Sequence, residues 1–153
     1  MFQRVIVVMP GAMESRDALV LGSQSASRDG VVVAANVLAS EPARLDGGPA
    51  AAARRRADLH DAGEEVYATL GPDQRVRYVT LSGAPLAEAI HALAQRERAD
   101  AIVVGQNAVA ADRSASRLVC GAPCVVLIAP VGHRFRRSSG LTVQNGTTHS
   151  RSR

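Results

Sequence analysis

Four short segments of this sequence are apolar at every position, and they constrain the fold more than any other feature. An extended segment that shows apolar side chains on both faces must be covered on both faces. We therefore predict strands of a parallel sheet with helices on either side. The four segments are Val5-Ile6-Val7-Val8, Val31-Val32-Val33, Ala101-Ile102-Val103-Val104 and Val125-Val126-Leu127-Ile128.

A fifth segment, residues 75–81, alternates instead. Val76 and Tyr78 lie on one face and Arg75 and Arg77 on the other. Charged side chains along one face are typical of a strand at the edge of a sheet. We expect this segment at an edge.

Helical patterns separate these segments. The clearest stripe has apolar residues at helical spacing and comprises Leu86, Ala89, Ile90, Leu93 and Ala94. Further helices are predicted over residues 15–28, along the stripe from Leu59 to Leu70, and between residues 112 and 119. Strands that alternate with helices favour right-handed crossovers and an open α/β sheet.

The length of 153 residues argues for one domain. We assign residues 1–130 to it, with a long connection over residues 41–49. Residues 131–153 are rich in Ser, Thr, Gly and Arg without periodicity, and we expect a disordered tail there.

The charge divides sharply along the chain. All 18 basic residues are arginine, and five of them follow Pro130, where no acid occurs. Residues 1–130 hold 13 arginines and 14 acids, so the domain is nearly neutral and the tail is basic. A tail that docks electrostatically on nucleic acid stays an alternative, with steeply salt-dependent binding. Two Phe and two Tyr offer almost no stacking platform, which argues against nucleic-acid recognition.

The sequence lacks the residues and motifs that several other classes of function require. No apolar stretch reaches the roughly 20 residues that cross a bilayer, so we expect no membrane insertion. Cys120 and Cys124 form neither a disulfide framework nor a complete zinc motif, which suits a reducing, cytoplasmic setting. The four histidines accompany no Gly-x-Ser-x-Gly, His-Glu-x-x-His or Walker motif. We expect a protein with no catalytic residues and no metal site.

Three stretches together resemble the universal stress protein family, over about residues 3 to 130. They are VIVVMPGAMESRDAL (5–19), GAPLAEAIHALAQRERADAIVVG (83–105) and GAPCVVLIAP (121–130). The resemblance implies a five-stranded parallel sheet of order 3-2-1-4-5 with helices on both faces. It also implies a regulatory or protective role under stress.

Family members that bind ATP carry an aspartate after the first strand and a Gly-x2-Gly-x9-Gly-Ser/Thr loop after the fourth. Here Pro10 takes the place of the aspartate, Gly105 matches the first glycine, and Ala108 takes the place of the second. Asp112-Arg113 falls at the final Gly-Ser, so the loop has about half its usual span. A Cβ and a carboxylate there oppose the approach of phosphates. We therefore expect no cofactor; the alternative is an ATP or adenine-nucleotide switch with at most slow hydrolysis.

Ligands of open α/β sheets bind at the carboxyl ends of the strands, where the strand order reverses. This rule, together with the resemblance, predicts a degenerate nucleotide cleft that could hold a small ligand or a protein partner. Its residues are Pro10, Gly11, Val37, Gly105, Gln106, Asn107, Arg113 and Ser114.

The last strand predicts the assembly. In the order 3-2-1-4-5 it lies at a sheet edge, yet it carries no charge and no internal proline. Such an edge invites pairing with another chain. We predict a homodimer in which the two last strands pair antiparallel, as family members commonly do, through Val125, Val126, Leu127 and Ile128.

Overall fold

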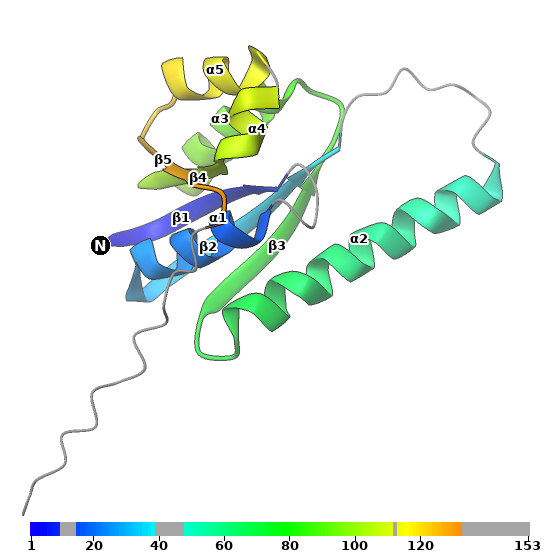
Figure 1. Ribbon diagram of the computed structural model, residues 1–153, viewed down its shortest axis with the longest axis horizontal. Helices are drawn as coiled ribbons and strands as arrows, with labels where there is room; N and C mark the ends of the chain where they lie inside the picture. The colour runs from blue at the N-terminus through cyan, green and yellow to red at the C-terminus, as the bar shows by residue number, and fades with distance from the viewer. Residues whose placement is uncertain (10–14, 39–47, 112, 133–153) are drawn as a thin grey trace, which may run out of the picture.

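Five parallel strands form one sheet of order β3-β2-β1-β4-β5 (Figure 1). The computed structural model describes residues 1–9, 15–38, 48–111 and 113–132. The strands are β1 (Phe2–Met9), β2 (Ala26–Val37), β3 (Arg75–Leu81), β4 (Ala101–Gly105) and β5 (Val125–Ala129). The helices are α1 (Arg16–Ser25), α2 (Pro49–Leu70), α3 (Leu86–Glu97), α4 (Gln106–Ala111) and α5 (Arg113–Cys120). The predicted fold class and strand order are confirmed.

The sheet separates two hydrophobic cores. Val5 and Val7 of β1 pack on one face with residues of α1 and α2, whereas Ile6 and Val8 pack on the other with α3, α4 and α5. Successive side chains of a strand point to opposite faces, so a strand between two helical layers needs apolar residues throughout. The apolar runs of β1 and β4 meet that requirement, and both strands are central.

The alternating strand lies at an edge, as predicted. Val76 and Tyr78 of β3 pack against the core beneath α2. On the other face, Arg77 reaches Glu97 at the end of α3, with Nη1 3.0 Å from Oε2 and Nη2 3.1 Å from Oε1. The charged side of β3 is therefore anchored by a two-point hydrogen-bonded ion pair.

Several element boundaries differ from the prediction. The first helix ends at Ser25, and β2 already begins at Ala26 rather than at Val31. Ala26 is buried opposite Phe2, and the register shifts before Arg4 meets Val31. Pairing with β1 therefore extends β2 into the polar residues 27–30. The local sequence pattern predicts the end of a helix there.

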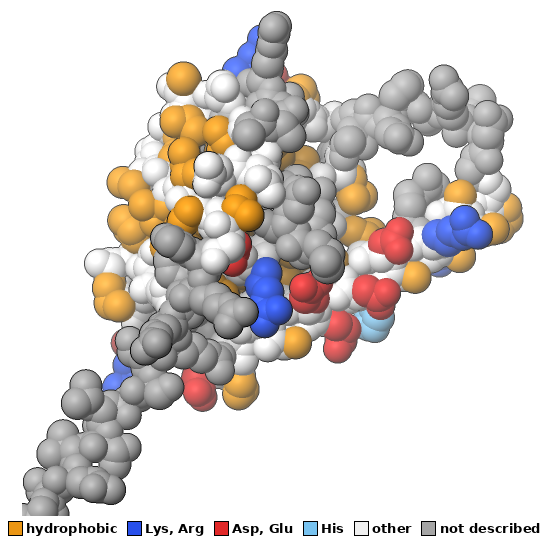
Figure 2. All heavy atoms as spheres, in the orientation of Figure 1, with side chains coloured by type: hydrophobic (Ala, Val, Ile, Leu, Met, Phe, Trp, Pro, Cys, Tyr) orange, Lys and Arg blue, Asp and Glu red, His pale blue; other side chains and the backbone are white. Residues whose placement is uncertain are grey.

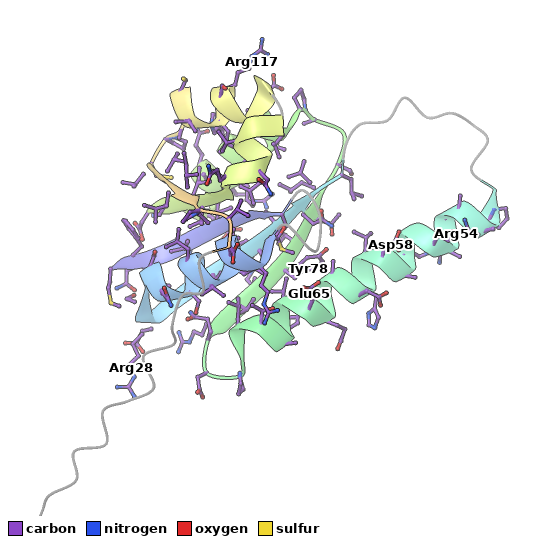
Figure 3. All side chains as sticks on the ribbon, in the orientation of Figure 1. Arg28, Arg54, Asp58, Glu65, Tyr78 and Arg117 are labelled. Atoms are coloured by element: carbon purple, nitrogen blue, oxygen red, sulfur yellow. The ribbon has the colours of Figure 1, made fainter. Side chains whose placement is uncertain are left out.

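The second helix begins at Pro49, ten positions before Leu59, the first residue of its predicted apolar stripe. Among its described side chains, the buried ones lie in its second half: Ala62, Gly63, Val66 and Leu70. Figure 3 shows Arg54 and Asp58 on the part that extends past the sheet, and Tyr78 beside the part that crosses it. In the described parts of the chain, no helix combines the length and the apolarity needed to span a bilayer.

Candidate functional site

The carboxyl ends of β1, β2 and β4 lie side by side at one end of the sheet. β1 pairs with β2 on one side and with β4 on the other, so the strand order reverses at β1. At this end of the sheet Val37 is half-buried, Gly105 is buried, and Gln106 and Asn107 are exposed. Val37 and Gly105 thus end the two strands that flank β1, and Gln106 and Asn107 follow directly after β4. Such a position is where open α/β sheets bind ligands.

The other predicted cleft residues are only partly described. Pro10 and Gly11 lie outside the described residues. Arg113 and Ser114 open α5, and their side chains are likewise outside the described set. The structure thus places α5 between β4 and β5, where the prediction put a short helix.

The chain after β4 is helical. α4 begins at Gln106, directly after Gly105, and was not predicted as a separate helix. The side chain of Ala108, which aligns with the second glycine of the ATP loop, is buried in the core beside residues of α3 and α5. Where the family motif requires a glycine that exposes its backbone, this chain has a helical residue that packs inward.

No protein-family model matches the chain, and no curated protein matches it. Solved structures do match. A universal stress protein in complex with cAMP is 22% identical over 83% of this chain and 95% of its own, with a TM-score of 0.59. A universal stress protein from Archaeoglobus fulgidus in complex with dAMP is 17% identical over 84% and 97%, with a TM-score of 0.59. A hypothetical protein whose biochemical function was assigned from its structure is 14% identical over 85% and 96%, with a TM-score of 0.68.

The chain has the universal stress protein fold. The resemblance read from the three sequence stretches is confirmed at the level of the fold, over most of the chain and over nearly the full length of these neighbours.

In this universal stress protein fold, two polar residues that the sequence did not single out lie beside the predicted rim. Asn36 precedes Val37 at the end of β2 and is in register with Met9 of β1 and Thr80 of β3. Its Nδ2 donates a hydrogen bond to the Tyr78 hydroxyl, at 3.0 Å. Both side chains are half-buried. In this hydrogen bond the Tyr78 oxygen is the acceptor, so the hydroxyl keeps its own capacity to donate.

The titratable side chains with catalytic potential serve other parts of the fold. The Nε2 of His91 lies 2.9 Å from the carbonyl oxygen of Leu118, which joins α3 to the end of α5. Cys124 directly precedes β5, at the amino end of the strands and away from the cleft. Burial and the nearby Asp100 carboxylate raise the pKa of its thiol. A protonated thiol is a weak nucleophile. Within the described residues no group of His, Cys, Asp or Glu could hold a metal ion.

Proposed function

We propose that this protein is a non-enzymatic, cytoplasmic stress-response regulator or binding protein of the universal stress protein type, with a cleft that has lost the features needed for tight ATP binding. The observation that supports the proposal is the path of the chain after β4. α4 follows Gly105 without an intervening loop, and Ala108 packs inward.

The physical argument concerns the phosphate chain. A triphosphate needs several backbone N–H groups that converge on it, and glycines permit the close approach. The N–H groups in the first turn of a helix such as α4 point along its axis, so they do not wrap around a chain of three phosphates. Pro10 also offers no carboxylate where ATP-binding relatives carry an aspartate. Both changes weaken the binding of ATP. A small ligand or a protein partner remains compatible with the cleft.

The alternative function is an ATP or adenine-nucleotide switch with at most slow hydrolysis, and a mononucleotide is the ligand that the structural neighbours favour. Two structural neighbours are complexes with cAMP and dAMP, which carry one phosphate each. A single phosphate needs fewer backbone contacts from the chain after β4 than a triphosphate does. The Asn36–Tyr78 pair would supply polar contacts for a base or a ribose.

A thermal-shift titration separates the two functions. A ligand present at 100 times its dissociation constant adds about 2.7 kcal/mol to the stability. The proposal expects no shift with millimolar Mg-ATP and no nucleotide in the purified protein. A shift with Mg-ATP would overturn it.

A shift with AMP or cAMP alone would establish the alternative. In that case Asn36→Ala should abolish the shift. Arg56→Gln, an exposed change on the first half of α2, should leave it intact and serves as the control.

We further propose that the protein acts as a homodimer through β5. The strand is an edge strand, and Val125 and Ile128 keep 50% and 47% of their surface exposed. Val119 of α5 and Val131 beyond the strand are exposed as well. Figure 2 shows hydrophobic side chains gathered over the region of α5 and β5. Antiparallel pairing of two such edges would satisfy the free backbone groups and cover these side chains.

A further inference from the structure

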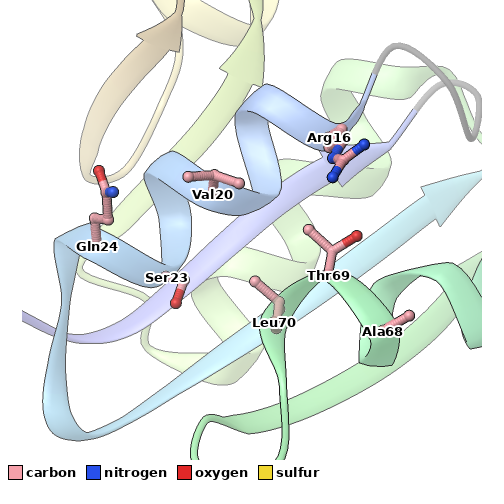
Figure 4. Close-up of a pocket in the computed structure, with 7 residues that line it drawn as sticks. All are labelled: Arg16, Val20, Ser23, Gln24, Ala68, Thr69 and Leu70. Atoms are coloured by element: carbon pink, nitrogen blue, oxygen red, sulfur yellow. The ribbon is translucent and has the colours of Figure 1, made fainter. Parts of the chain in front are cut away.

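A groove runs between α1 and the end of α2, apart from the cleft at the strand ends (Figure 4). Its volume is about 360 Å³. Arg16, Val20, Ser23 and Gln24 line it from α1, and Thr69 and Leu70 line it from α2. Ligand pockets in proteins commonly begin near 300 Å³, so the groove suits a small molecule.

The spacing of the residues on α1 explains the groove. Arg16, Val20, Ser23 and Gln24 follow the i, i+4, i+7, i+8 pattern and therefore form one stripe that faces α2. Ser23 of α1 and Thr69 of α2 have short, polar side chains. The side chains of the two helices therefore leave space between them. A short turn after Gly71, which has φ = 76°, carries the chain away from the end of α2.

The polar groups of the groove are available for a ligand. Among the described residues, the ion pairs join Glu97 to Arg77 and Arg96, so Arg16 has no carboxylate within 4.0 Å there. Figure 4 shows Arg16 opposite Thr69 at one end of the groove, and Ser23 and Gln24 toward the other. Ser23 Oγ donates to Gln74 Oε1 at 3.3 Å and keeps its lone pairs as acceptors.

We propose that this groove binds the phosphate ester of a small polyol. The Arg16 guanidinium matches a phosphate in shape and charge. Thr69, Ser23 and the Gln24 carboxamide can exchange hydrogen bonds with hydroxyl groups. Val20 and Leu70 offer an apolar wall for the carbon face of a sugar. This second site is independent of the function proposed for the strand-end cleft.

Glucose 6-phosphate is the probe, with glucose and inorganic phosphate as its two halves. The site predicts saturable binding of the ester by ¹H–¹⁵N NMR, with shifted amides in α1 and in the last turn of α2. Glucose alone should bind at least about tenfold more weakly, because the charge-assisted contact is lost. No binding at millimolar ester, or equal binding of glucose, would overturn the proposal.

Arg16 is exposed, so the Arg16→Gln protein should stay folded. It should bind the ester at least about tenfold more weakly, and Thr69→Val several-fold more weakly, whereas Arg56→Gln should match the parent protein. Unchanged affinity of Arg16→Gln would overturn the assignment.

The position of the shifts separates this site from the cleft. Amides that move at Val37, Gly105 and Gln106 instead of in α1 would place the ester in the cleft and refute the groove. A nucleotide titration followed by the same amide shifts reports on the cleft only where Val37, Gly105 and Gln106 move, so either proposal can fail while the other holds.

Discussion

Gly22 of α1 lies so close to β1 that an added Cβ would stand 2.4 Å from Val7 Cγ2. Val7 is fully buried and cannot move aside. Gly63 of α2 is also buried, but its added Cβ would meet the Tyr78 ring at 3.6 Å, an ordinary contact. The same residue type thus has opposite roles on two helices of one layer.

We predict opposite effects for alanine at these glycines. An alanine gains about 1 kcal/mol of helix propensity over glycine. Gly63→Ala should realise most of it and stabilise the protein by about 0.5–1 kcal/mol. At Gly22 the overpacking cost of roughly 1–3 kcal/mol opposes that gain, so Gly22→Ala should be destabilising. Urea denaturation measures both, and a Gly22→Ala protein as stable as Gly63→Ala would contradict the close packing of α1.

The ion pair between Arg77 and Glu97 predicts an asymmetry between two arginines. Glu97 is 8% exposed, and Arg77 contacts both of its carboxylate oxygens. Arg77→Met would leave a buried carboxylate without this partner and should cost about 1–3 kcal/mol. Arg96, whose Nε lies 3.9 Å from Glu97, has a largely exposed side chain, and Arg96→Met should change the stability by less than about 0.5 kcal/mol.

Chemical denaturation of the two single variants checks this asymmetry. Adding Glu97→Gln to Arg77→Met should restore part of the lost stability, because the unpaired charge is removed. Equal losses for Arg77→Met and Arg96→Met would show that the two-point contact contributes nothing.

The two cysteines should differ in reactivity. Burial and the Asp100 carboxylate raise the pKa of the Cys124 thiol, so its thiolate forms only above the usual pH range for a thiol. Cys120 is exposed. At pH 7–8, iodoacetamide should therefore alkylate Cys120 first, and Cys124 should react faster as the pH rises further. Peptide mass spectrometry reports each site, and preferential labelling of Cys124 at pH 7 would refute this order.

At the scale of elements, β5 combines an edge position with exposed apolar side chains. Its residues divide by exposure: Val126 and Leu127 pack partly against the two cores, whereas Val125 and Ile128 stay half-exposed. A charge at Val126 would therefore disturb the core as well as any interface. Ile128 is the cleaner position at which to test pairing.

We expect Ile128→Lys to convert the proposed dimer to a folded monomer. The substitution places a charge on the pairing edge, and the desolvation of that charge opposes association. Light scattering measures the mass, and circular dichroism confirms the fold. Tyr67→Lys, an equally exposed site on α2, should leave the dimer intact. A dimeric Ile128→Lys protein would remove the strand-pairing proposal.

At the scale of the whole molecule, the excess positive charge and the described core lie in different parts of the chain. The described core residues extend no further than Ala129, while five of the 18 arginines follow Pro130. The pI near 10 therefore reflects the tail rather than the domain. The Gly132 N–H donates to Asp17 at 3.0 Å and ties the end of the domain to α1.

A chain that ends at Gly132 should fold as the full chain does. Its core and the Gly132–Asp17 hydrogen bond are complete, so we expect a Tm within about 2 °C of the full-length value, a shift that matches a few tenths of a kcal/mol. Isoelectric focusing should show the pI falling from near 10 to below 7, since 13 arginines face 14 acids in residues 1–130. A loss of Tm by ten degrees would show that residues 133–153 belong to the domain.

The sequence by itself determined the sheet, its two buried faces and the edge position of β3, because apolarity on one or both faces is a property of each segment alone. The resemblance supplied the strand order. Only the tertiary structure decided the early start of β2, the helix after Gly105, the burial of Glu97 beneath Arg77, the Asn36–Tyr78 pair and the groove between α1 and α2. Each of these depends on contacts between segments that are far apart in the sequence, and the periodicity of one segment does not specify those contacts.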